Sequence, residues 1–303
     1  MEKLKMAFAG AWYPATAREC QSSIHQFLKE KQGVLTGDVV GGIVPHAGWY
    51  YSGSIACRVI ASLQSGHKGP EYKPEHKIDA QKDDPRTIDT IVLFGGHMHP
   101  QSDPFVLSHG RIETPFGQIE VDAAFVDQFA GRIGLDKKTP ARFPDENTFE
   151  LQNPFIKYFF PESKIVVCAV SPNATAIAIG KAVADTACEM GKNIRIIGST
   201  DMTHYGPNFG LICAGKGKEA VKWVEKQNDR QAIDAMLKMD ETQIIELGLA
   251  NKSMCCPGAA AATVCACKKM GAASALELDY ATSFEKSESD SFVGYSGIVY
   301  ACS

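Results

Sequence analysis

Short apolar runs alternate along the chain with longer segments in which apolar positions recur every three to four residues. The short runs are rich in β-branched residues and predict buried strands, whereas the longer pattern is typical of helices. The predicted strands cover residues 38–45, 87–95, 163–170, 193–200, 274–282 and 291–301. The predicted helices cover residues 54–64, 123–134, 148–160, 174–190, 215–238 and 241–249, and a further helix begins near residue 257.

This alternation of strands and helices predicts an α/β fold, with a mainly parallel central sheet flanked by helices. A β-hairpin is expected within residues 110–122, with its turn at Pro115–Gly117. The charged segment 65–86, which contains prolines and glycines, predicts a solvated insertion. Because no linker divides the rest of the chain, we expect one domain over residues 1–303.

Composition and charge exclude some classes of partner. The chain has 303 residues, of which 45% are hydrophobic and 22% are charged, as in globular proteins. Its formal net charge of −4 argues against electrostatic binding to nucleic acid or to an anionic membrane. No apolar stretch approaches the roughly 20 residues that span a bilayer. The first residues lack the hydrophobic region of a signal peptide, so we expect a cytoplasmic protein.

Three predicted strands lead directly into a histidine. His46 follows the first of these strands, His97 and His99 follow the second, and Asp201 and His204 follow the third. Because ligands in open α/β sheets bind at the carboxyl ends of the strands, we expect these side chains to meet at one edge. His204 is then a candidate general base, oriented by Asp201. The alternative is that each histidine is only a hydrogen-bonded turn residue.

The ten cysteines are expected to be reduced thiols, in keeping with a cytoplasmic protein. Cys255 and Cys256 come just before a predicted helix, whose N-terminus stabilises a thiolate that can bind a metal, act as a nucleophile or take part in redox chemistry. The side chains of these adjacent residues are expected to diverge. Cys265 and Cys267 are expected to pack in the core. Two histidines and one anionic ligand would form a three-ligand face with open positions, where a carboxylate suits non-haem iron and a thiolate suits Cu(I) or Zn(II).

Seven segments in this order resemble the Memo family: "AGAWYPA", "VPHAGWYYSG", "GGHMHP", "TPFGQIEVD", "DENTFELQNPF", "STDMTHYG" and "DYATS…SFVGYSGIVYA". In bacteria and archaea this family includes protein B of the AmmeMemoRadiSam system. Its fold is similar to that of the class III extradiol dioxygenases of the LigB type, which bind Fe(II) through two histidines and a glutamate. The resemblance implies that His46 and His97 are metal ligands, with Cys255 in the place of the glutamate. It also implies that Asp201 and His204 line the same pocket.

The chain departs from the family pattern at three positions. Asn147 stands where the family commonly has a histidine, Cys256 stands where it commonly has a glycine, and His99 is additional. The resemblance implies a protein with a dioxygenase-like metal pocket that acts with a radical-SAM partner on a small-molecule or peptide ligand. Fe(II) is the expected metal, with Cu or Zn as alternatives, and any enzymatic activity would be that of a metal-dependent oxidoreductase. The remaining alternatives are a non-catalytic peptide- or metal-binding module and a thiol-redox protein that uses Cys255 and Cys256.

Overall fold

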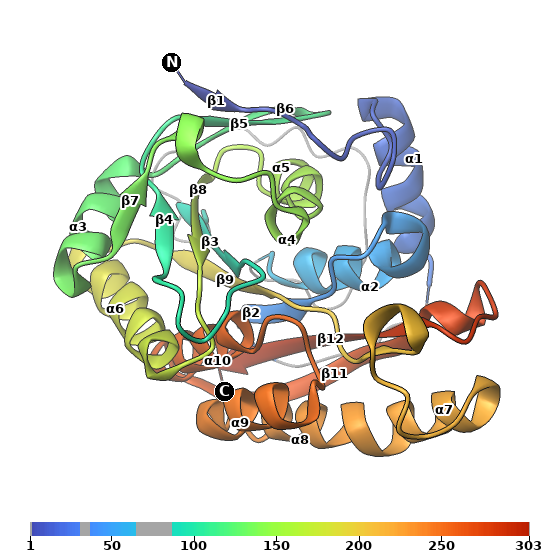
Figure 1. Ribbon diagram of the computed structural model, residues 1–303. Coiled ribbons are helices and arrows are strands. Elements are labelled where there is room, and N and C mark those ends of the chain that lie inside the picture. The colour runs from blue at the N-terminus through green and yellow to red at the C-terminus, as the bar shows by residue number, and fades with distance from the viewer. Residues whose placement is uncertain (1, 31–36, 65–86, 303) are drawn as a thin grey trace.

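The computed structural model describes residues 2–30, 37–64 and 87–302, and the predicted insertion 65–86 lies outside them. Within the described residues, the larger of two sheets has nine strands (Figure 1). Its order is β10 (His204–Tyr205), β12 (Phe292–Cys302), β2 (Val39–Val44), β9 (Ile194–Ser199), β3 (Thr90–Gly95), β8 (Lys164–Ala169), β4 (Phe105–Leu107) and β7 (Asp136–Lys138), with β11 (Ala272–Thr282) paired to β12. The smaller sheet contains β1 (Lys3–Leu4), β5 (Arg111–Thr114) and β6 (Gly117–Glu120).

The predicted α/β class is confirmed, and the parallel part of the sheet is its centre. Strands β2, β9, β3 and β8 run parallel to one another. The flanking strands β12 and β4 are antiparallel to their neighbours β2 and β8. Strands β11 and β12 form a long hairpin, and consecutive strands with so short a connection pair antiparallel. The predicted hairpin within 110–122 is confirmed as β5–β6.

Helices cover both faces of the central strands. The α-helices of the described residues are α1 (Ala17–Phe27), α2 (Trp49–Ser62), α3 (Ala123–Ile133), α4 (Asn147–Glu150), α5 (Asn153–Phe159), α6 (Ala174–Met190), α7 (Gly217–Trp223), α8 (Asp229–Leu237), α9 (Glu241–Asn251) and α10 (Pro257–Lys269), and a π-helical turn (Val224–Asn228) joins α7 to α8. A Cβ atom on Gly42 would lie 2.6 Å from Cγ1 of Val59 in α2, whereas the adjacent Gly41 faces Cys267 of α10. Because adjacent strand residues point to opposite faces, α2 and α10 cover opposite faces of the sheet.

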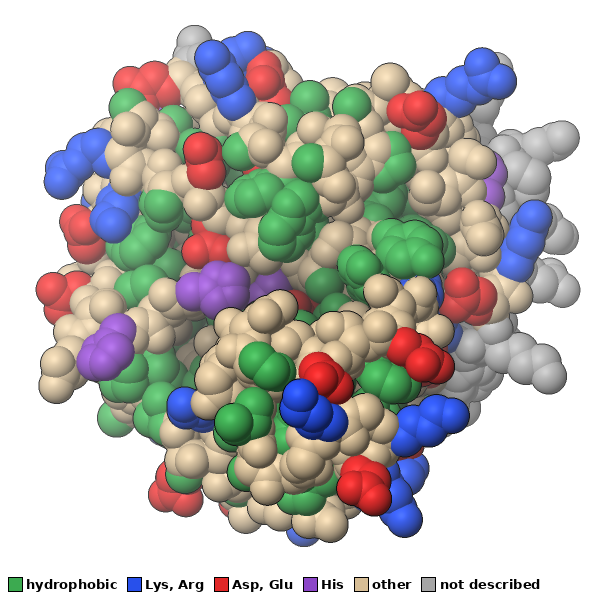
Figure 2. Space-filling view, turned by 45° about the vertical axis from the view of Figure 1, so that its right-hand side comes forward, with side chains coloured by type: hydrophobic (Ala, Val, Ile, Leu, Met, Phe, Trp, Pro, Cys, Tyr) green, Lys and Arg blue, Asp and Glu red, His purple; other side chains and the backbone are tan. Residues whose placement is uncertain are grey.

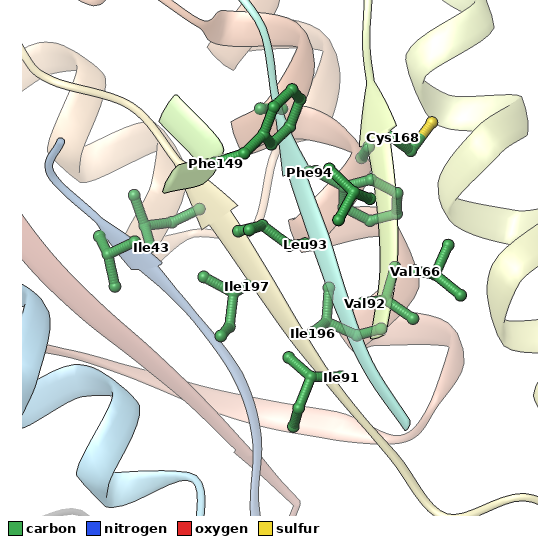
Figure 3. Packing of buried hydrophobic residues seen from close by; sticks show 14 of the residues in the cluster. Ile43, Ile91, Val92, Leu93, Phe94, Phe149, Val166, Cys168, Ile196 and Ile197 are labelled. Carbon is green, nitrogen blue, oxygen red and sulfur yellow. The ribbon is translucent and has the colours of Figure 1, made fainter. Parts of the chain in front are cut away.

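Apolar side chains fill the space between these layers (Figure 3). Ile43, Ile91, Leu93, Ile196 and Ile197 from three neighbouring parallel strands are fully buried. Because these strands are buried on both faces, most of their residues are apolar and many are β-branched. Such continuous runs are easy to identify as strands in the sequence. None of the helices in the described part of the chain is long and apolar enough to cross a bilayer.

Candidate metal centre

Three strand ends form one edge of the sheet. Strand β9 lies between β2 and β3 and is parallel to both, so the carboxyl ends of all three strands lie side by side. The chain leaves these ends at His46, Asp201 and His97. The structure therefore brings together the loops that carry the predicted histidines, at the position where open α/β sheets bind ligands.

Helix α10 packs against β2, β9 and β3, and two hydrogen bonds hold its N-terminus at the same edge. The backbone N–H of Cys255 donates to the carbonyl of Asp201, with 3.1 Å between N and O. The backbone N–H of Cys256 donates to Oγ1 of Thr200 at 3.0 Å. These bonds tie the segment before α10 to the segment that follows β9, so both cysteines are held beside the strand ends.

Four side chains converge at this edge, and we call them the His/Cys cluster: His46, His97, Cys255 and Cys256. One potential ligand atom from each lies within 4.8 Å of the other three. Nε2 of His46 lies 3.2 Å from Sγ of Cys255, and the two imidazole rings meet edge to face with centroids 5.1 Å apart. The expectation that the side chains of Cys255 and Cys256 diverge is wrong. Cys256 is the N-cap of α10, with φ −127° and ψ 61°, and the alternation of adjacent side chains holds for strands rather than for a helix start.

The second nitrogen of each imidazole has its own partner. Nδ1 of His46 lies 3.0 Å from Oγ of Ser199, and Nδ1 of His97 lies 3.0 Å from Oε1 of Glu146. These contacts leave Nε2 of both rings for the cluster. The sequence reasoning missed both partners. Glu146 precedes a short helix and caps it by accepting a hydrogen bond from the N–H of Thr148, so in the sequence it resembles an ordinary helix cap.

Charge in the metal-free cluster is shared between thiolate and imidazolium. Burial acts to raise the pKa of Cys255, but the hydrogen bond from Cys256 and the nearby His46 and His97 lower it well below its usual value. Burial acts to lower the pKa of His46, but Asp201 and Cys255 raise it overall. Hydrogen bonds to Cys255 and Glu146 raise the pKa of His97 to about 10. The cluster therefore stabilises an anionic sulfur beside two imidazole rings whose protonated forms are favoured.

Asp201 and His204 line the same cavity as the cluster histidines, and each has a backbone hydrogen-bond partner. Oδ1 of Asp201 accepts a hydrogen bond from the backbone N–H of His46 at 2.7 Å, and burial raises the pKa of this carboxyl group. Nδ1 of His204 lies 3.2 Å from the carbonyl oxygen of Met202. His204 is thus oriented by the Met202 carbonyl, and Asp201 instead fixes the loop that begins at His46.

Two further residues singled out in the sequence have structural contacts. Nδ2 of Asn147 donates to the carbonyl oxygen of His46 at 3.2 Å, so Asn147 supports the His46 loop. Nδ1 of His99 accepts a hydrogen bond from the backbone N–H of Gln101 at 3.2 Å and lies outside the cluster. His99 is therefore a turn residue, which was the alternative considered for each histidine.

A cavity of about 560 Å³ opens above the cluster. His46, His97, Asn147, Asp201 and His204 line its polar side. Aromatic side chains form much of the remaining wall: Trp12, Tyr50, Tyr51, Phe209, Phe292 and Tyr295. In Figure 2, histidine side chains gather beside a hollow that hydrophobic side chains border. None of the described residues that line this cavity is Lys or Arg, so its walls suit a small ligand that carries aromatic or other apolar groups.

The N-terminal segment reaches this cavity because a buried carboxylate anchors it. Glu150 accepts hydrogen bonds from the backbone N–H groups of Ala7 and Phe8 at 2.9 and 2.7 Å, and from the hydroxyl of Tyr13 at 2.9 Å. Trp12 lies within the anchored segment and forms part of the cavity wall. A carboxylate this deeply buried is stabilised by its hydrogen bonds, and it places an aromatic ring over the site.

The chemistry of the cluster fits a transition-metal ion. Imidazole nitrogen and thiolate sulfur are the ligand atoms that Zn(II), Cu and Fe accept in proteins. Metal-bound histidines commonly pair their other nitrogen with a carboxylate, as His97 does with Glu146. Both rings are therefore oriented for ligation by contacts already present in the protein.

Comparison with known proteins identifies relatives of this chain. A family model described as "Memo-like protein" matches residues 5–299. A MEMO1 family protein from Methanopyrus kandleri is 30% identical, and the match covers 97% of each chain. A MEMO1 family protein from Methanosarcina acetivorans is 31% identical, with 99% of each chain covered. The crystal structure of an uncharacterized protein from Escherichia coli K12 is similar at a TM-score of 0.47 and 10% identity, over 71% of this chain and 87% of that one.

Proposed function

Because the chain belongs to the family of Memo-like proteins, we propose that it binds a transition-metal ion through the Nε2 atoms of His46 and His97 and the Sγ atom of Cys255. The observation that carries this proposal is the convergence of these ligand atoms within 4.8 Å. The contacts of the second nitrogen of each ring, with Ser199 and Glu146, support it. The ion would lie at the base of the aromatic cavity.

A bound metal would supply Lewis-acid or redox chemistry at this position. The residues of the chain supply the rest of the site. With Nδ1 of His204 bonded to the Met202 carbonyl, its Nε2 is available to accept a proton from a ligand in the cavity. Asp201 holds the His46 loop, and the aromatic walls exclude water from a ligand that lies against them. Dioxygenase activity and a radical-SAM partner stay predictions from the resemblance.

The metal-binding proposal is tested by measuring metal content and affinity in protein purified without oxygen and with reductant. We expect about one metal ion per chain, and we expect His46→Ala and Cys255→Ser each to lower the affinity at least about tenfold, since each removes a ligand. His99→Ala is the matched control, because His99 lies just after His97 but outside the cluster. Native-like affinity in both cluster variants would contradict the proposal.

A second candidate function is thiol-redox chemistry, which the proximity of Cys255 and Cys256 favours. Both are free thiols, and their sulfur atoms lie within 4.8 Å of each other. A two-electron oxidant such as oxidised glutathione would take two electrons and two protons from the pair as a disulfide formed between adjacent residues. Mass spectrometry of metal-free protein poised in glutathione buffers would detect this loss of two protons. Reversible oxidation in native protein that purifies without metal would favour this function over metal binding.

A further inference from the structure

We propose that Cys256 is a fourth metal ligand, so that two imidazoles and two thiolates surround the ion and select Zn(II) over Fe(II). This inference rests on the metal-binding function proposed above and deepens it by naming the coordination and the class of ion. Neither the strand-end pattern nor the three-ligand comparison with the dioxygenases includes Cys256. The inference comes from where the structure places its sulfur atom.

The spacing of the four ligand atoms is close to that of a tetrahedral site. Bond lengths of about 2.0–2.1 Å to nitrogen and about 2.3 Å to sulfur require the ligand atoms to lie about 3.3–3.8 Å apart. Nε2 of His46 and Sγ of Cys255 are 3.2 Å apart, and all four atoms lie within 4.8 Å of one another. Each pair therefore needs to close by at most about 1.5 Å, which side-chain rotation can supply.

The backbone of Cys256 is fixed on both sides. Its N–H donates to Oγ1 of Thr200 at 3.0 Å, and its carbonyl oxygen accepts a hydrogen bond from the N–H of Ala260 at 3.2 Å in the first turn of α10. The side chain is only 2% exposed. Cys256 is the N-cap of a 13-residue helix, a position at which the helix dipole favours a negative charge. The fold thus holds this sulfur at the cluster. Burial and the neighbouring Cys255 raise the pKa of the Cys256 thiol, so a metal ion would bind this sulfur by displacing its proton.

The imidazoles and the thiols of the cluster differ in their relation to the cavity. His46 and His97 line the cavity, whereas neither Cys255 nor Cys256 is among the described residues that line it. The sulfur atoms would therefore hold the ion from the protein side while the imidazoles face the cavity. Four protein ligands complete a tetrahedron, so a cavity ligand would bind the ion only by displacing one of them or by expanding the coordination.

The four-ligand arrangement predicts which ion is retained. Two thiolates and two imidazoles form a donor set typical of tetrahedral zinc sites. Fe(II) sites of the two-histidine, one-carboxylate type use harder ligands and leave positions open. We therefore infer that this site binds Zn(II) more tightly than Fe(II), and that the ratio of the two affinities exceeds the one expected from the Irving–Williams order alone.

The test uses Co(II) as a spectroscopic probe and Zn(II) as competitor, with the full-length, metal-free protein kept reduced under nitrogen. Native protein should show intense visible bands of tetrahedral Co(II) and a sulfur-to-metal charge-transfer band. Cys256→Ser should reduce the charge-transfer intensity about twofold and weaken Zn(II) binding at least about tenfold. Cys265→Ser, which changes another cysteine on the same helix outside the cluster, should match the native protein.

The outcomes separate this inference from the function on which it rests. If Cys255→Ser loses the metal while Cys256→Ser binds with native intensity and affinity, metal binding stands and the fourth ligand is overturned. If native protein binds neither ion, both proposals fail. X-ray absorption of the zinc-loaded native protein needs no variant: two sulfur and two nitrogen neighbours support the inference, and one sulfur neighbour overturns it.

Discussion

The imidazole of His97 and the carboxylate of Glu146 form a pair in which Nδ1 lies 3.0 Å from Oε1. Glu146 also accepts a hydrogen bond from the N–H of Thr148, so the helix start fixes the carboxylate before it contacts the ring. Burial acts to raise the pKa of Glu146, but the bond to His97 and its charge lower it overall. The ionised carboxylate in turn orients the ring so that its Nε2 points to the His/Cys cluster.

This pair predicts that Glu146 controls metal affinity without touching the metal. Glu146→Gln keeps the shape of the side chain but removes its charge, so the ring becomes a weaker ligand and loses part of its orientation. We expect the affinity for Zn(II) to fall about 10–100-fold. Competition with a chromophoric chelator measures the change. Asp145→Asn, which changes the exposed acid just before Glu146 in the chain, is the control and should bind as the native protein does.

Metal affinity should rise steeply with pH. The pKa of His97 is raised to about 10 and that of His46 is raised above its ordinary value, so in the metal-free protein both rings hold their protons more tightly than a free imidazole does. A metal must displace these protons, and each displaced proton contributes about a tenfold gain in affinity per pH unit below the pKa. Zn(II) titrations between pH 6 and pH 9 should show a gain of at least about tenfold per unit. A flat profile would mean that the rings are not ligands.

The sequence predicts the strand-end part of the site better than the rest. Runs such as that before His46 are buried on both faces, so their composition identifies them as strands, and the edge to which they lead follows from parallel pairing. Strand β7 (Asp136–Lys138), by contrast, consists of one aspartate and two lysines, so it lacks the apolar residues that predict a strand. It forms a strand because its backbone pairs with β4, and the local sequence does not predict this pairing.

The partners of the cluster were not predictable for a related reason. Ser199 ends a strand and Glu146 begins a short helix 53 positions earlier in the chain, yet each contacts one histidine of the cluster. Such contacts depend on how β9 and the α4 loop pack in three dimensions. The convergence of Cys256 depends on the dihedral angles of a helix N-cap, which the residue type alone does not determine.

A second buried acid, Asp229, holds the loop that carries Asp201 and His204. Its Oδ1 accepts a hydrogen bond from the N–H of Thr203 at 3.0 Å, and its Oδ2 accepts one from the hydroxyl of Tyr280 at 2.8 Å. Burial raises the pKa of Asp229 to about 7, despite these hydrogen bonds. Asp229 follows directly after the π-helical turn Val224–Asn228, and such turns often occur beside functional sites.

The raised pKa predicts a specific pH dependence of stability. The folded protein keeps the Asp229 proton at pH values where the unfolded chain has released it. Its stabilising contribution is therefore complete below about pH 4 and is lost as the pH rises through about 7. Between pH 5 and pH 8, native protein should lose about 2–3 kcal/mol of unfolding free energy relative to Asp229→Asn, which cannot ionise. Urea unfolding of both proteins at pH 5 and pH 8 measures this change. If the difference in unfolding free energy between native protein and Asp229→Asn is the same at both pH values, the pKa of Asp229 is not raised.

Replacement of Cys255 by glutamate should change which metal the site prefers. The substitution exchanges a soft thiolate for a hard carboxylate beside His46 and His97, and carboxylates favour Fe(II) relative to Cu(I) and Zn(II). We expect Cys255→Glu to bind Fe(II) at least as well as the native protein and to bind Cu(I) at least about tenfold more weakly. Cys255→Ser is the control, because it removes the thiolate without adding a carboxylate, and it should bind both ions weakly. Anaerobic titrations of the three proteins with each ion decide the matter. If Cys255→Ser retains native affinity for Cu(I), Cys255 is not a ligand, and the sulfur that lies 3.2 Å from Nε2 of His46 has a redox or structural role instead.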